Sequence, residues 1–331
     1  MAILSAVNPT LADVAKRLDH NGNVDTVVEI LNLTNDILDD ATFIEANGPT
    51  SHRTTVRTGI PSPTWRKLYG GVQPTKSTTV QVTDNTGMME NYAEVDKALV
   101  DLNGNTTAFR MSEEVAIIEG FNQEFASSLI YGNEGTNPAT FTGLAPRYNS
   151  LSAASGDNII SGGGSSNLTS IWLLCWGPQT IHCIYPKGSK AGLQINDKGQ
   201  VTIENVDGAG GRMEAYRTHY RWDCGLSVRD WRYAVRIANI DVTALTKNAS
   251  AGADLIDLLA QAVERLPAIG LGRPVFYANR TIRSFLRRQI ANKVAASTLT
   301  METVMGKKVV AMDGIPFKRV DKILNTESQV S

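Results

Sequence analysis

The sequence predicts an α+β protein, in which helices and sheet strands occupy different stretches of the 331-residue chain. Residues 106–131 carry apolar side chains at spacings of three and four, as an amphipathic helix does. Residues 231–237 alternate bulky and polar side chains, which is typical of a half-buried strand. The hydrophobic fraction of 42% and the charged fraction of 20% are those of a globular protein. The length allows two lobes with separate cores.

Residues 1–47 are expected to form two short helices. Thr10 and Asp13 have the spacing of an N-terminal helix cap. Asn21, Gly22 and Asn23 interrupt the first helix, and a second helix is expected after them. The pair predicts a small packed arm.

The character of the sequence changes in residues 48–92. Mainly polar, β-prone residues at 54–58 and 77–83 flank a middle rich in glycine and proline. This pattern predicts a long hairpin with few residues for a core of its own. Because an isolated two-stranded hairpin is marginal in water, the arm needs a surface to lie on.

Two further regions follow the hairpin. Residues 93–250 are expected to hold the helix of residues 106–131 and strands between residues 168 and 242. In residues 251–331 helices and strands alternate, which predicts a second lobe with its own sheet.

Charge and cysteine content argue against a dedicated nucleic-acid-binding protein and against a protein held together by disulfides. The 32 basic and 33 acidic residues give a net charge of −1, whereas dedicated nucleic-acid binders usually have a basic excess. The three cysteines include no Cys-x-x-Cys pair, which fits reduced thiols in a cytoplasmic protein. No signal peptide is expected at the start, and no apolar run approaches the roughly 20 residues of a membrane span.

His182, Cys183, His219 and Cys224 have the nitrogen and sulfur atoms that could bind one zinc ion. However, His182 and Cys183 are neighbours on an expected strand, so their side chains point to opposite faces. The gap from His219 to Cys224 has the same effect if its strand is regular. The pattern favours buried thiols and imidazoles over a metal site.

Other chemical motifs are equally incomplete. There is no Gly-x-Ser-x-Gly turn, and no nucleophile can be paired with a base. Residues 162–164 are three glycines that lead into a strand, whereas a phosphate-binding glycine loop opens a helix. We therefore assign no catalytic residue, no cofactor and no metal. The acid pairs Asp39–Asp40 and Glu113–Glu114 fit solvated helix faces.

The expected helix after Asn279 has a basic side, and three interpretations of it remain open. It could be a solvated face, a contact for acidic residues of a neighbouring subunit, or a contact for packaged DNA. The basic residues concerned are Arg280, Arg283, Arg287, Arg288 and Lys293.

Several segments, in the same order along the chain, resemble the major capsid proteins of short-tailed, double-stranded DNA phages of the epsilon15 and Bordetella type. The likeness runs from about residue 10 to residue 328. The segments include SHRTTVRTG from Ser51, GVQPTKST from Gly71, YAEVD from Tyr92, FTGLAPRYN from Phe141, IYPKGSKAGL from Ile184, GLSVRDWRY from Gly225 and GIPF from Gly314.

The resemblance implies the Hong Kong 97-like phage capsid fold. Residues 1–47 would then be the N-arm, 48–92 the E-loop, 93–250 the P-domain with its spine helix at 106–131, and 251–331 the A-domain. In that fold the A-domain usually comes before the last P-domain strands. We therefore expect a permuted strand order, and peripheral-sheet strands within residues 254–320 would overturn this expectation.

The implied function is self-assembly through hexamers and pentamers into an icosahedral shell around the double-stranded DNA genome, without enzyme activity. Implied protein partners are other copies of the chain, a cement or decoration protein, a scaffolding protein and the portal. The inner face of the shell would contact DNA without sequence specificity. No membrane partner is implied. The protein would be made in the bacterial cytoplasm and end in the virion. The alternatives are a phage hydrolase or protease and a decoration protein. Candidates for inter-subunit contacts are Arg53, Arg57, Arg66, Lys67, Lys76, Arg283 and Arg287.

Overall fold

The computed structural model describes residues 33–101, 106–205, 209–246, 252–291, 299–304 and 307–331. These residues divide into two compact units. One unit contains Met88–Phe125 and Gly192–Asp223, and the other contains Thr34–Gly87, Ala126–Ala191 and Cys224–Ser331. The helices expected in residues 1–32 lie outside the described residues.

The first unit combines a long helix with long strands. Helix α4 (Thr106–Tyr131) has the bounds that the sequence predicted, and its residues up to Phe125 belong to this unit. Strands β7 (Gln194–Glu204) and β8 (Arg212–Val228) pair antiparallel over the stretch that lies here. The unit also holds the second half of β3 (Thr78–Asp96) and helix α3 (Lys97–Val100). Asp96 caps α3 by accepting a hydrogen bond from the amide of Ala98.

The apolar stripe of α4 is only partly buried. Phe121 and Phe125 are buried, and the Phe125 ring stacks on Trp222 with 4.6 Å between ring centroids. Met111, Val115 and Ile118 belong to the same stripe, but they are 60%, 47% and 41% exposed. The predicted continuous core stripe is therefore wrong for this half of the helix, because the described part of the unit does not cover it.

The second unit is built on a mixed sheet with β5 (Leu168–Trp176) at its centre, and every residue of β5 is buried. Strand β5 pairs antiparallel with β9 (Ala234–Asp241) and β10 (Arg273–Ala278). Further strands extend the sheet: β1 (Phe43–Glu45), β4 (Ile159–Ser161), β6 (Ile181–Tyr185), β11 (Leu299–Val304), β12 (Lys307–Met312) and β13 (Ile315–Arg319).

The pairing of β10 corrects one expectation. Residues 251–331 were expected to have their own sheet, but β10 pairs with β5, and β13 pairs parallel with β10. The reason lies in β10 itself: Val275, Phe276, Tyr277 and Ala278 are all buried, and a strand apolar on both faces belongs inside a sheet. The permuted order depended on the separate sheet and loses its basis.

Two helices accompany the sheet of the second unit. Helix α6 (Leu255–Glu264) is capped by Asp254, whose carboxylate accepts hydrogen bonds from two amides of its first turn. Helix α7 (Arg280–Ala291) follows Asn279, whose side-chain oxygen accepts from the amide of Ile282. Shorter helical segments are α2 (Ile37–Asp40), α5 (Leu144–Arg147), η2 (Ala154–Asn158), η3 (Trp231–Tyr233) and η4 (Ile269–Leu271).

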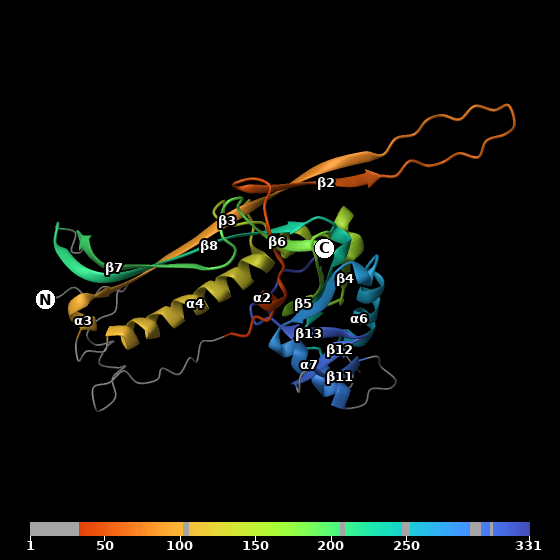
Figure 1. Cartoon of the computed structure of the whole chain (residues 1–331). Helices are drawn as coiled ribbons and strands as arrows, with labels where there is room; N and C mark the ends of the chain where they lie inside the picture. The colour runs from red at the N-terminus through yellow and green to blue at the C-terminus, as the bar shows by residue number, and fades with distance from the viewer. Residues whose placement is uncertain (1–32, 102–105, 206–208, 247–251, 292–298, 305–306) are drawn as a thin grey trace. The chain divides into compact units, whose positions relative to one another are not determined.

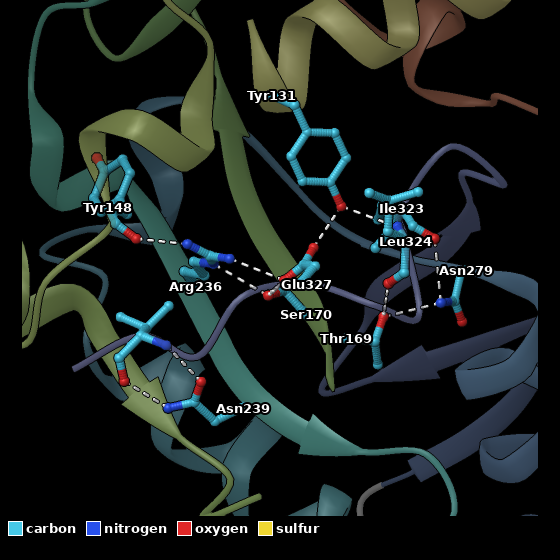
Figure 2. Close-up of polar contacts among 11 residues, drawn as sticks. Tyr131, Tyr148, Thr169, Ser170, Arg236, Asn239, Asn279, Ile323, Leu324 and Glu327 are labelled. Carbon is cyan, nitrogen blue, oxygen red and sulfur yellow. Dashed lines mark hydrogen bonds and ion pairs between the residues drawn. The ribbon is translucent and has the colours of Figure 1, made fainter. Parts of the chain in front are cut away.

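A buried ion pair joins the C-terminal segment to this sheet (Figure 2). The Arg236 guanidinium lies 2.9 Å from the Glu327 carboxylate, and the two side chains are 5% and 4% exposed. The hydroxyl groups of Ser170 and Tyr131 also donate to Glu327. Burial and the adjacent carboxylate raise the pKa of Tyr131, so its hydroxyl stays protonated and remains a donor. The carboxylate is therefore fully satisfied inside the protein.

Candidate assembly surfaces

The predicted hairpin is confirmed. Strand β2 (Ser51–Gly59) pairs antiparallel with the start of β3, from Ser51 opposite Asn85 to Gly59 opposite Thr78. Only Thr54 is buried along β2. Residues 60–77 continue as an extended loop beyond the paired strands (Figure 1). The hairpin has almost no core of its own, as its sequence indicated.

The root of the hairpin is firmly anchored in the second unit. Asp84 on β3 is 2% exposed. The Arg147 guanidinium lies 2.9 Å from its carboxylate, and the Ser227 hydroxyl donates to it at 2.8 Å. Because a buried carboxylate with such partners fixes its backbone, the arm leaves the unit in a defined direction.

The tip of the hairpin exposes large apolar side chains. Trp65 and Tyr69 are fully exposed, and Leu68 and Ile60 are 89% and 84% exposed. Side chains of this kind in one exposed segment mark a contact surface, and aromatic residues contribute most to such contacts. None of them was among the predicted contact candidates. The sequence feature that could have predicted their contact role is the presence of aromatic residues in a Gly/Pro-rich loop that has no core in which to bury them.

The five predicted candidates on the hairpin are all exposed. They are Arg53, Arg57, Arg66, Lys67 and Lys76. The sequence contains no acidic residue between Ser51 and Thr83, so this segment carries five positive charges. The structure therefore joins an apolar tip to a basic arm.

The first unit offers an exposed apolar surface of a different shape. The exposed side chains of Met111, Val115 and Ile118 lie on one face of α4, and a hollow of about 610 Å³ lies against another face of the same helix. The hollow is lined by Met88, Met89, Glu90, Asn91, Ala116, Ile117, Gly120, Phe121 and Glu124. Its walls combine two methionines, small residues and one aromatic ring with acidic groups.

The remaining two predicted candidates lie on another element. Arg283 and Arg287 are on α7, where Arg283 is half-buried and Arg287 is exposed. Arg280 and Arg288 lie on the same helix, whereas Lys293 is outside the described residues.

The histidines and cysteines with possible zinc-binding atoms do not form a metal site in the stretches that the structure describes. His182 and Cys183 are consecutive on β6, as predicted. Burial lowers the pKa of His182 to about 4 and raises the pKa of the Cys183 thiol, so both groups stay neutral. In the described part of the chain, no group of three or more His, Cys, Asp or Glu residues could hold a metal ion.

Comparison with known proteins decides the family. The family model of the major capsid protein GP7 matches residues 19–331. The chain belongs to this family. A chain in the near-atomic-resolution structure of bacteriophage epsilon15 is 44% identical to this capsid protein, with a TM-score of 0.79, and the match covers 100% of this chain and 99% of that one. None of the curated proteins matches.

The capsid protein has the Hong Kong 97-like fold, which confirms the fold that the sequence resemblance implied. A chain of the bacteriophage JBD30 capsid is also similar, at 10% identity and a TM-score of 0.48, over 96% of this chain and 99% of that one. Membership of the family places the capsid protein in the virion. No helix among the described residues is long and apolar enough to cross a membrane.

Proposed function

We propose that the chain assembles through hexamers and pentamers into an icosahedral shell around a double-stranded DNA genome, and that its hairpin is the E-loop that binds a neighbouring copy. Helix α4 takes the part of the spine helix. The supporting observation is the hairpin tip, where Trp65, Tyr69, Leu68 and Ile60 are exposed on an arm without a core. Because the chain belongs to a family of major capsid proteins, the molecule expected to cover this tip is another copy of the chain.

The energies involved favour cooperative assembly over a stable pair of subunits. Burying one large apolar side chain contributes about 1.5–3 kcal/mol, so the tip contributes roughly 10 kcal/mol. Association costs about 4–15 kcal/mol in lost freedom of motion. One docked hairpin is therefore marginal by itself. A closed ring gives every subunit two such contacts, because head-to-tail interfaces close when their rotation closes.

We propose further that the hairpin tip of one copy docks on the α4 surface of its neighbour. The hollow beside α4, with Met88, Met89, Ile117 and Phe121 in its walls, provides apolar area for the tip. Charge is complementary as well: the hairpin carries five basic residues, whereas residues 106–125 hold four glutamates and one arginine. Opposite charge steers the two surfaces together and disfavours other orientations.

Deletion of residues 54–82 tests the role of the hairpin. We expect a folded subunit that forms no shells, because the arm contributes little to the core but supplies the contact. Analytical sedimentation distinguishes megadalton particles from free subunits, and thermal unfolding reports whether the subunit is intact. Normal particles from this variant would contradict the proposal.

Cysteine cross-linking tests the docking site separately. A Leu68→Cys, Ala116→Cys double variant should form covalent ladders of subunits on oxidation, because one cysteine would lie on the tip and the other beside the hollow. The matched control is Leu68→Cys with Leu271→Cys, which is exposed but lies outside the proposed site. The background should be low, since Cys175, Cys183 and Cys224 are all buried. Equal ladders from both variants would rule out this docking site.

We also infer that the capsid protein acts without catalysis and is made in the host cytoplasm. The neutral imidazole of His182 and the protonated, buried thiols support this, because neither group is activated for reaction. A cement or decoration protein, a scaffolding protein and the portal are the further partners that we infer for such a shell.

A further inference from the structure

A second surface, distant in sequence from the hairpin, consists almost entirely of arginine. A hollow of about 370 Å³ lies on the second unit between α7 and the end of β13. Its lining residues are Arg280, Arg283, Ser284, Arg287, Arg288 and Arg319. No carboxylate is among them.

Helical geometry explains why these side chains meet. Residues three and four positions apart lie on one face of a helix, so Arg280, Arg283 and Arg287 follow one another along α7. Arg288 is held nearby, with its guanidinium 4.1 Å from the centre of the Phe285 ring. Arg319, at the end of strand β13, brings a fifth guanidinium to the four on α7.

The carboxylates close to this hollow are already engaged. The Asp321 carboxylate binds the Arg319 guanidinium through both of its oxygens. The Asp36 carboxylate accepts the backbone amide of Arg319 at 3.1 Å. Five arginines beside two carboxylates leave three positive charges in excess.

Arg283 shows that the cluster is not balanced within its own unit. Its side chain is half-buried, and its Nε atom is buried without a hydrogen-bond partner. Burial lowers the pKa of Arg283, and the positive charges of Arg287 and Arg319 act in the same direction, whereas Asp36 and Asp321 oppose them. A buried guanidinium donor normally has an acceptor. An anion placed in the hollow would offset the positive charge that surrounds Arg283.

We propose that this arginine hollow binds phosphate groups of double-stranded DNA. Guanidinium groups form paired hydrogen bonds with phosphate oxygens, and several arginines can share one phosphate. The cluster contains arginine and no lysine, which suits this geometry. Only the choice of DNA as the polyanion rests on the proposed function, because the shell would enclose the genome.

Charge density favours DNA over a segment of another copy of this chain. Double-stranded DNA carries one negative charge for about every 1.7 Å of its axis. The capsid sequence contains no run of more than two acidic residues, and its two acid pairs are Asp39–Asp40 and Glu113–Glu114. One member of the first pair, Asp40, already binds Lys318 at 2.5 Å. A second copy therefore offers no segment with comparable negative charge.

Fluorescence anisotropy with a labelled 20-base-pair duplex tests the site. The full chain would be used at a concentration where sedimentation shows unassembled subunits, so the result does not depend on shell formation. We expect Arg283→Gln with Arg287→Gln to weaken binding at least tenfold at low salt. The slope of log affinity against log salt should fall by about 2, since each lost phosphate contact contributes about 0.9.

Two controls make the result decisive. Arg53→Gln with Arg57→Gln removes the same charge from the hairpin and should change the slope less than half as much. If Arg283→Gln lowers thermal stability, Arg287→Gln with Arg288→Gln replaces it, because both of these residues are exposed. Equal losses from the hairpin and α7 variants, or no loss from the α7 variants, would overturn the proposal. Displacement of the duplex by poly-glutamate at equal charge concentration would also overturn it, in favour of an acidic protein partner.

Discussion

Strands β5 and β2 have nine residues each, yet β5 is buried and most of β2 is at least partly exposed. All nine residues of β5 are buried, and it pairs with β9 and β10. In β2 only Thr54 is buried, and β3 is its partner in the described sheet. The chain thus covers β5 with its own atoms, whereas most of β2 stays at least partly exposed. If the hairpin makes the shell contact, we expect that residues for subunit stability and residues for assembly can be altered independently.

The two kinds of tryptophan give the largest expected difference. Trp172 on β5 is 1% exposed, whereas Trp65 on the hairpin is fully exposed. We expect Trp172→Ala to lower the free energy of unfolding of the free subunit by about 3–5 kcal/mol, because it leaves a cavity. Trp65→Ala should change it by less than about 0.5 kcal/mol while preventing shell formation. Urea denaturation and sedimentation measure the two effects, and a large loss of subunit stability from Trp65→Ala would break the comparison.

The buried ion pair gives an effect of similar or slightly smaller size. Glu327→Gln removes the negative charge and leaves the Arg236 guanidinium buried without its counter-charge. We expect the free energy of unfolding to fall by about 3–5 kcal/mol in urea denaturation. The matched control is Glu204→Gln, which breaks an ion pair with Arg212 in which both side chains are 69% exposed. No measurable change is expected there, and equal effects would show that burial is not the cause.

The pH dependence of stability should report mainly on the buried sheet, with a smaller contribution from the root of the hairpin. Burial holds the pKa of His182 at about 4, whereas the unfolded chain has an imidazole pKa of about 6.5. The unfolded state therefore binds more protons between these values. The stability contribution is complete above pH 6.5 and is lost as the pH falls towards 4, by about 3 kcal/mol.

His182→Gln is the test of this assignment. Denaturation midpoints measured between pH 4 and pH 7 should depend less on pH in the variant than in the parent protein. Burial also lowers the pKa of His52, so a smaller dependence with the same sign should remain. An unchanged slope in His182→Gln would assign the titration to other groups.

Sequence periodicity predicted the elements whose signal is local. The bounds of α4 were predicted because an apolar spacing of three and four persists over its whole length. The hairpin was predicted from its polar strands around a Gly/Pro-rich middle. Which strands pair was not predictable in this way, because the apolar residues of β10 indicate burial but not that β5 is the neighbour.

The contact surfaces also depend on residues that are far apart in the sequence and that local patterns do not bring together. The basic side of α7 was predictable from helical spacing, but Arg319 joins it from β13 through tertiary structure. Arg236 looked like the polar face of a half-buried strand, yet it is buried against Glu327, 91 positions later. At the hairpin tip the sequence analysis predicted only charged residues as contact residues. The exposed Trp65 and Tyr69 were not predicted.

The pairing of Arg236 with Glu327 also affects the order of events during synthesis. Strands β5, β9 and β10 all leave the ribosome before Glu327 does, since protein chains are made from the N-terminus. Until that carboxylate emerges, Arg236 is an unneutralised cation that resists burial. We expect the nascent sheet to stay loosely packed until then.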